Sequence, residues 1–133
     1  MEHAFKQKVF YSDTDAYGVV WHGSYLRWLE MGRVLLCEEA GYKLSELVKE
    51  NIILPVVNLD IAYKNSAKLD DIITIKTKII ETGRFYLIFN QKILDEKEQK
   101  EYIDATVKVV AINEDGKLYR SLPEQILDII NHK

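Results

Sequence analysis

Cysteine and long apolar runs are scarce in this sequence, and each scarcity excludes a class of protein. One cysteine, Cys37, stands among 133 residues, so no internal disulfide framework is available. The longest stretch free of Asp, Glu, Lys and Arg runs only from Ala16 to Leu26, whereas a membrane-spanning helix needs about 20 apolar residues. The first six residues contain no apolar signal core. We therefore expect a cytoplasmic protein without a membrane span.

An excess of positive charge is also missing. The net charge is −3 and the pI is near 5.6, which gives no overall attraction for nucleic acid. An anionic ligand would need local cations. Candidates near predicted strand ends or turns are Lys64, Lys68, Arg84 and Arg120. Together they could hold the phosphates of a nucleotide-bearing ligand, although each alone is equally an ordinary solvated side chain.

Apolar residues, in contrast, are plentiful. The chain is 47% hydrophobic and 29% charged, a balance that excludes intrinsic disorder. Its length matches the commonest domain size, and no Pro/Gly/Ser-rich linker divides it. We expect a single domain over residues 1–133.

The spacing of these apolar residues predicts the elements. A period near 3.6 predicts one long helix, with Ser24 as its N-cap and Gly41 just past its end. Gly32 lies inside this helix, where glycine costs about 1 kcal/mol relative to alanine, so we expect a neighbour packed too closely for a side chain. Shorter helices are expected over residues 44–50 and 125–130. Alternation predicts five strands, over residues 5–11, 57–63, 73–79, 85–93 and 105–111.

This order of elements indicates an α+β fold. One strand, one long helix and four strands in meander order suit an antiparallel five-stranded sheet with the helix on one face. The opposite face would not be fully polar, because it would carry Tyr86, Ile88, Val110 and Ile112. Edge strands also need covering, and both observations favour a homo-oligomer.

The stretch from Tyr11 to Glu30 is the best candidate for chemistry. Asp13 and Asp15 precede the long helix, whose N-terminus offers unpaired N–H groups and a positive dipole end. Those groups can stabilise an oxyanion, while a carboxylate acts as general base or nucleophile. The pattern therefore suits acyl transfer to water, although either aspartate could instead form a cap or an Asx-turn.

The neighbours of this motif are less decisive. His22 could supply its side chain or, as we favour, only its backbone N–H at the helix entrance. Glu30 could face the ligand or simply pair with Arg33 at i+3. Three aromatic residues could line an apolar site or pack in the core, with core packing favoured for the last: Tyr17, Trp21 and Tyr25.

Metal sites and nucleophile elbows do not fit the sequence. Asp13, Asp15 and Gly18 match three positions of a calcium loop, but Ser24 stands where a glutamate is required. The three histidines and Cys37 show no zinc-ligand spacing, and no Gly-x-Ser-x-Gly or phosphate-binding glycine loop occurs. We expect no metal and no cofactor, with Cys37 in the core.

Residues 11 to 30 read Tyr-x-Asp-Thr-Asp-x-x-Gly-Val-Val-Trp-His-x-x-Tyr-x-x-Trp-x-Glu. This motif resembles the hotdog-fold acyl-CoA thioesterases, in particular the 4-hydroxybenzoyl-CoA and Tol-Pal-associated groups. The resemblance extends over nearly the whole chain, including Pro-Val-Val at residues 55–57, Lys-Asn-Ser-Ala-Lys-Leu-Asp-Asp at 64–71 and Tyr-Arg-Ser-Leu-Pro at 119–123. It implies a curved sheet around one long helix, dimerised edge to edge and often paired again into a homotetramer.

The resemblance also implies roles for residues. The catalytic carboxylate falls on Asp15, the carbonyl-polarising N–H on His22 and an acidic residue facing the acyl group on Glu30. The remaining substrate-binding positions are Tyr17, Gly18, Trp21 and Tyr25. Coenzyme A phosphates would meet Arg84, with help from Lys64, Lys68 or a neighbouring subunit. Tyr17 stands where the family commonly has a small residue, so the acyl pocket is expected to be narrowed or reshaped.

Three other functions compete with hydrolysis of acyl-CoA. The substrate could be an acyl-carrier-protein thioester. The protein could be a non-catalytic subunit that binds acyl thioesters, although the intact Asp15 argues against it. A hydratase or dehydratase on the same scaffold usually needs a catalytic histidine in a different motif, and only His22 is near the helix entrance. The acyl chain itself stays open among aromatic, short branched and medium straight chains.

Overall fold

The structure is a computed structural model that describes residues 2–132. Met1 and Lys133, the ends of the predicted single domain, lie outside the described residues. The elements in chain order are β1 (Glu2–Lys8), a 3-10 turn (Tyr11–Asp13), α1 (His22–Glu39), α2 (Leu44–Lys49), β2 (Val56–Tyr63), β3 (Ile72–Thr82), β4 (Tyr86–Asp95), β5 (Glu101–Val110) and α3 (Glu124–Ile130).

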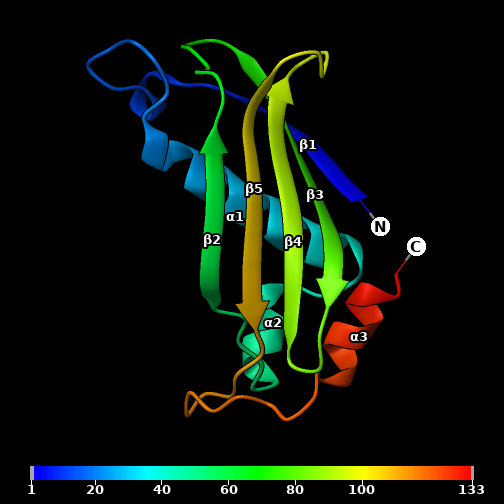
Figure 1. Cartoon of the computed structure of the whole chain (residues 1–133). Coiled ribbons are helices and arrows are strands. Elements are labelled where there is room, and N and C mark those ends of the chain that lie inside the picture. The colour runs from blue at the N-terminus through cyan, green and yellow to red at the C-terminus, as the bar shows by residue number, and fades with distance from the viewer. Residues whose placement is uncertain (1, 133) are drawn as a thin grey trace.

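The five strands form one antiparallel sheet that crosses α1 on a single face (Figure 1). The strand order is β1-β3-β4-β5-β2, which confirms the predicted α+β architecture. The predicted four-strand meander is wrong in one respect, because only β3, β4 and β5 follow one another. β2 pairs with β5 instead of β3, since residues 64–71 carry the chain away from the β2 edge before β3 begins.

The first strand is placed differently from its prediction. It runs over Glu2–Lys8 rather than residues 5–11, because the chain leaves the sheet after Val9. The Val9 N–H donates to the Asp71 carbonyl at 2.8 Å. Next, the Phe10 N–H donates to the Asp13 carboxylate at 2.9 Å and closes a tight turn. Tyr11 is therefore part of this turn and not of a strand.

The long helix begins earlier than predicted. Its first residue is His22 and its N-cap is Trp21, so the assignment of Ser24 as N-cap is wrong. The Ser24 hydroxyl donates to the Asp13 carbonyl at 3.0 Å instead. The other end agrees with the prediction, because Gly41 follows the Ala40 C-cap with φ of +97°, a left-handed conformation that glycine adopts without a steric penalty.

The core lies between α1 and the sheet. Tyr25, Trp28 and Leu29 on α1 pack in the same cluster as Ile75 and Ile103 on the strands, all of them buried. Gly32 lies directly on the sheet, as expected, because a Cβ there would stand 2.9 Å from Gln91 Nε2 and closer still to Thr77 Oγ1. The absence of a side chain at Gly32 therefore sets how closely the helix approaches the strands.

The opposite face of the sheet is mixed in character. Tyr86, Ile88 and Val110 alternate with residues that are buried beneath α1, and the Lys108 ammonium lies 4.4 Å from the centre of the Tyr86 ring. Among residues 2–132, no helix combines the length and apolarity that crossing a bilayer requires.

Candidate active site

A short hairpin builds the candidate site between β1 and α1. Thr14 and Val20 face each other across it as a bridge pair, and the Asp15 N–H donates to the Val19 carbonyl at 2.9 Å. Gly18 makes the reversal with φ of +82°, a conformation that a side chain at this position would strain. The Val20 N–H donates to the Ala67 carbonyl at 2.9 Å, which fastens the hairpin to the loop after β2.

Asp15 keeps one carboxylate oxygen available. Its Oδ1 accepts the Tyr17 N–H at 2.8 Å, which forms the Asx-turn considered from the sequence. Within the described chain no donor contacts Oδ2, and the residue is only half-buried. The turn therefore holds the carboxylate in place and leaves one oxygen to act on a ligand.

The first turn of α1 offers a free donor next to this carboxylate. The Trp21 N–H donates to the Asp13 carbonyl at 2.9 Å, and the Ser24 N–H donates to the Trp21 carbonyl at 2.9 Å. The His22 N–H has no acceptor among residues 2–132, as is usual for the first N–H groups of a helix. The His22 carbonyl accepts the Tyr63 hydroxyl at 3.3 Å.

Asp15 and His22 line the same pocket of about 300 Å³. Tyr25 also lines this pocket. Its buried hydroxyl accepts the Ala67 N–H at 3.0 Å, and burial raises the pKa of that hydroxyl. Lys64 also lines the pocket and pairs with Glu101 at 3.2 Å. The remaining lining residues are Val19, Val20, Tyr63, Asn65 and Ser66.

Two of the predicted aromatic residues do not line this pocket. The side chain of Tyr17 is 91% exposed, so its ring points into solvent rather than narrowing the cavity. Trp21 is also exposed, and its ring lies 5.1 Å from that of His22. Gly18 contributes through its backbone, because its N–H donates to the Asp15 carbonyl at 3.1 Å.

Glu30 lies in another part of the molecule. It is exposed and eight residues beyond His22, about 12 Å farther along the helix. It lines a separate, largely apolar cavity of about 290 Å³ together with Arg33. No ion pair joins Glu30 to Arg33 within the described residues; the Arg33 guanidinium donates to Gln91 Oε1 at 2.9 Å, and burial lowers its pKa while Glu30 opposes that shift.

The four cations considered for phosphate binding, Lys64, Lys68, Arg84 and Arg120, are not brought together in one chain. Arg120 lies two residues before Leu122, whose N–H donates to the Arg84 carbonyl at 2.9 Å. Lys68 lies close to the hairpin, since it bridges Val19 and its N–H donates to Asp71. Arg84 lies in the turn between β3 and β4, and Figure 1 shows this turn at the end of the sheet opposite the loop after β2. That turn is at the opposite end of β3 from Lys68, roughly 30 Å away along the strand. Lys64 and Lys68 therefore belong to the pocket end of the molecule and Arg84 to the other.

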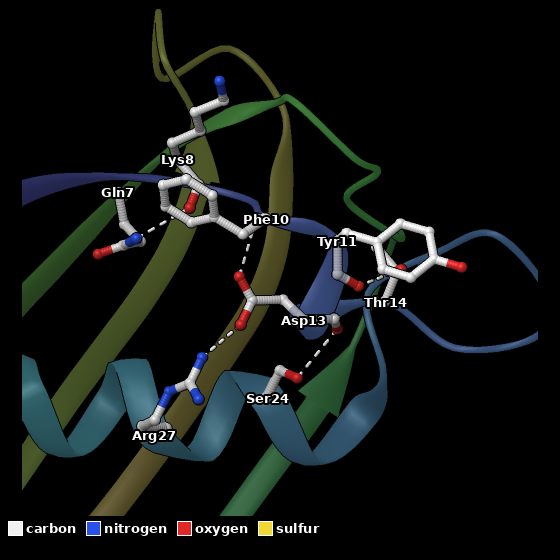
Figure 2. A network of polar contacts seen from close by, with 8 residues as sticks. All are labelled: Gln7, Lys8, Phe10, Tyr11, Asp13, Thr14, Ser24 and Arg27. Carbon is white, nitrogen blue, oxygen red and sulfur yellow. Dashed lines mark hydrogen bonds and ion pairs between the residues drawn. The ribbon is translucent and has the colours of Figure 1, made fainter.

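Asp13 has the structural role considered for it from the sequence. Its carboxylate is 3% exposed, accepts the Phe10 N–H and forms an ion pair with Arg27 (Figure 2). Its carbonyl accepts both the Trp21 N–H and the Ser24 hydroxyl. The carboxylate and the carbonyl of the first aspartate of the motif therefore both bind groups within the protein.

The sequence interpretation missed Tyr63, Asn65, Ser66 and Arg27. The alternation of β2 assigned Tyr63 to a strand, and no local pattern showed that the end of this strand meets the start of α1. The signal present was the Lys-Asn-Ser run directly after the strand. Within residues 2–132, no group of three His, Cys, Asp or Glu side chains could hold a metal ion.

Comparisons with known proteins show the family of the chain. The profile of the Thioesterase-like superfamily matches residues 9–130. An acyl-CoA thioester hydrolase, YbgC of Escherichia coli O6:H1, is 32% identical over 120 residues, which cover 90% of this chain and 89% of that protein. The acyl-CoA thioesterase YbgC of Haemophilus influenzae is 29% identical over 130 residues, covering 97% of this chain and 94% of that protein.

A solved structure is similar over most of its length as well. The DHNA-CoA thioesterase from Staphylococcus aureus superposes with a TM-score of 0.84 at 27% sequence identity. The superposition covers 90% of this chain and 80% of that one.

Proposed function

The chain belongs to the Thioesterase-like superfamily. We propose that it is an acyl-CoA thioesterase acting through Asp15. The observation that carries the proposal is the pocket that Asp15 shares with the first turn of α1. Among residues 2–132, Asp15 supplies a carboxylate oxygen that no donor contacts, and the first turn of α1 supplies the His22 N–H, which has no acceptor. Hydrolysis of a thioester needs both at one carbonyl.

The two groups have complementary roles. Asp15 either takes a proton from water as that water attacks the thioester carbonyl, or attacks the carbonyl itself. The carbonyl oxygen becomes an oxyanion, which accepts the His22 N–H at the positive end of the helix dipole. The oxyanion then collapses and the carbon–sulfur bond breaks; the leaving thiolate of coenzyme A takes the proton held by Asp15 in the first route and a proton from water in the second. Hydrolysis of a covalent intermediate by water completes the second route.

Coenzyme A is held by few cations in this proposal. Lys64 at the pocket and Lys68 beside it supply the charge for its phosphates, aided by the polar side chains of Asn65 and Ser66. Arg84 is too far away to serve the same site, so it would act only across a subunit boundary. Glu30 would likewise meet the acyl group from a neighbouring protomer.

Release of free thiol from acyl-CoA substrates tests the function directly. We expect turnover with at least one member of a panel that includes aromatic, short branched and medium straight acyl groups. The detection chemistry is compatible with the protein, because burial raises the pKa of the Cys37 thiol to about 11 and keeps it unreactive. Tight binding of acyl-CoA without thiol release would instead favour a non-catalytic binding subunit. Turnover confined to acyl-carrier-protein thioesters would show that the substrate is carried by acyl carrier protein and not by coenzyme A.

We further propose that the protein is a homodimer joined through β2, with a second pairing into a tetramer. β2 is an edge strand that exposes apolar side chains, including Val57 at 54% and Leu59 at 38%. Edge strands of this kind invite pairing with another chain. The other edge, β1, exposes Lys6 and Lys8 instead, and charge of this kind blocks such pairing.

Replacing Leu59 with Lys should shift the protein toward the monomer. The substitution places a charge without a partner in the proposed interface, where burying it would cost several kcal/mol. Light scattering after size-exclusion chromatography measures the mass of each species and separates dimer from tetramer. Ala4→Lys on the exposed β1 edge is the matched control and should leave the mass unchanged. A monomeric wild-type protein would rule out the interface.

The proposed compartment is the cytoplasm. The one cysteine is buried and free, as suits a reducing environment.

A further inference from the structure

The hairpin that carries Asp15 is tied to the loop after β2 through Val20 and to the start of α1 through Asp13. On one side, the Asp13 carboxylate accepts the Phe10 N–H at 2.9 Å and pairs with Arg27 in the second turn of α1. On the other side, its carbonyl accepts the Trp21 N–H at 2.9 Å and the Ser24 hydroxyl at 3.0 Å. One residue therefore holds the end of β1, the hairpin and the helix together, as Figure 2 shows.

This arrangement joins the two groups of the proposed active site. Asp15 follows Asp13 by two residues, and His22 directly follows Trp21, whose N–H is bound by Asp13. The remaining hydrogen bonds of the hairpin run within it or to the loop after β2, such as those of the Asp15 and Val20 N–H groups. Among the hydrogen bonds and ion pairs of residues 2–132, those of Asp13 connect the start of the hairpin to the side chains of α1, through Arg27 and Ser24, while Val20 packs in the same core cluster as Tyr25.

The burial of this ion pair is asymmetric. Asp13 is 3% exposed, whereas the side chain of Arg27 is 61% exposed. Because the Asp13 carboxylate is buried, removing Arg27 alone would leave a buried charge without its ionic partner and cost stability, so an effect on stability has to be separated from an effect on activity. A buried carboxylate without a partner would also place a second negative charge beside the helix end where an oxyanion must form, and this would oppose the reaction.

We propose that the Asp13–Arg27 ion pair is a positioning device that sets the Asp15 carboxylate relative to the His22 N–H. The inference rests on the proposed thioesterase activity and deepens it. Neither residue touches the reacting atoms; both act by holding the hairpin at one angle to α1. Placement matters because a misalignment of about 1 Å can lower a rate by about 100-fold.

The test compares variants that remove one charge or both. Arg27→Met keeps much of the side-chain length and should lower kcat by about 10- to 100-fold with KM within about twofold of wild type. Arg27→Lys should recover part of the loss, because it keeps the charge. Asp13→Asn should lower kcat similarly, since its amide can still accept the Phe10 N–H but no longer binds Arg27 as an ion.

The double variant Asp13→Asn/Arg27→Met separates a positioning role from the effect of an unpaired buried charge. It leaves no unpaired buried charge, so its melting temperature should stay near that of wild type while kcat stays low. Recovery of wild-type kcat in this variant would overturn the proposal, because the charge rather than the placement would then matter. A rise in KM alone in Arg27→Met would also overturn it, since Arg27 would then bind substrate.

A matched control and a substrate-free measurement complete the test. Lys76→Met removes two other surface ion pairs, with Glu98 at 2.7 Å and with Glu2 at 3.3 Å, and should leave kcat unchanged; an equal loss there would contradict a specific role for Arg27. Amide hydrogen exchange at Asp15 and Trp21 should become at least about tenfold faster in Arg27→Met, with β4 and β5 unaffected. Unchanged exchange would overturn the positioning role. Because exchange needs no turnover, this result stays separate from a failure of the proposed thioesterase activity.

Discussion

Asp15→Asn should fold like the wild-type protein and lose nearly all thiol release, with kcat reduced by about 10²- to 10⁴-fold. The amide keeps the shape of the carboxylate, and its oxygen can still accept the Tyr17 N–H that closes the Asx-turn. What it removes is the basic and nucleophilic character of the group. The measurement is steady-state release of coenzyme A from the best acyl-CoA of the panel.

The Asp15 experiment needs a control for the loss of a negative charge. Asp115→Asn changes an exposed carboxylate in the turn near Gly116, remote from the pocket, and should leave turnover intact. Circular dichroism and the melting temperature should be the same for both variants and the wild type. Wild-type turnover in Asp15→Asn would contradict the assigned catalytic role and leave the family membership untouched.

Gly32→Ala should destabilise the protein by about 1–3 kcal/mol, although alanine is the better helix former. At an exposed helical position the same change would stabilise by roughly 1 kcal/mol, so the sign of the effect is diagnostic. The added Cβ would stand 2.9 Å from Gln91 Nε2 and would overlap Thr77 Oγ1. Both side chains are fully buried and hydrogen-bonded to each other, so neither can move aside easily. Urea unfolding monitored by circular dichroism measures the change.

A second substitution identifies the cause of that destabilisation. Thr77→Ala removes the hydroxyl that the new methyl group meets first. Combined with Gly32→Ala, it should give a smaller loss than the sum of the two single losses, with a coupling of about 0.5–3 kcal/mol. A strictly additive pair, or a stabilised Gly32→Ala protein, would contradict the close packing of α1 on the sheet.

Much of the fold was predictable because its causes are local. The alternation in strands β2 to β5, the spacing in α1 and the glycine at its C-terminal end all depend on near neighbours in the chain. The place of β2 was not predictable in the same way. Its pairing with β5 brings together residues that are more than forty positions apart, such as Ile61 and Ala105, and short-range patterns carry no information on that choice.

The candidate site likewise contains residues that local sequence predicts and residues that only the tertiary structure brings to it. The placement of Asp15 and His22 together at the start of α1 was predictable because turn residues just before a helix have a local chemical meaning. Tyr63 and Ser66 reach the pocket only because β2 ends beside α1. The start of α1 was misplaced for a related reason: the Ser24 hydroxyl, a good local cap, is engaged by Asp13 eleven residues earlier.

The order of pairing in the sheet has a consequence for synthesis of the chain. β1 precedes β3 in the sequence but pairs with it, so Phe5 cannot pair with Ile75 until β3 has been synthesised. The hairpin around Asp15 is likewise fastened by Ala67 and Asp71 through Val20 and Val9. Such distant contacts form slowly compared with local ones. The hairpin around Asp15, although it precedes β2 and β3 in the sequence, therefore becomes ordered only after the segment with Ala67 and Asp71 has been made.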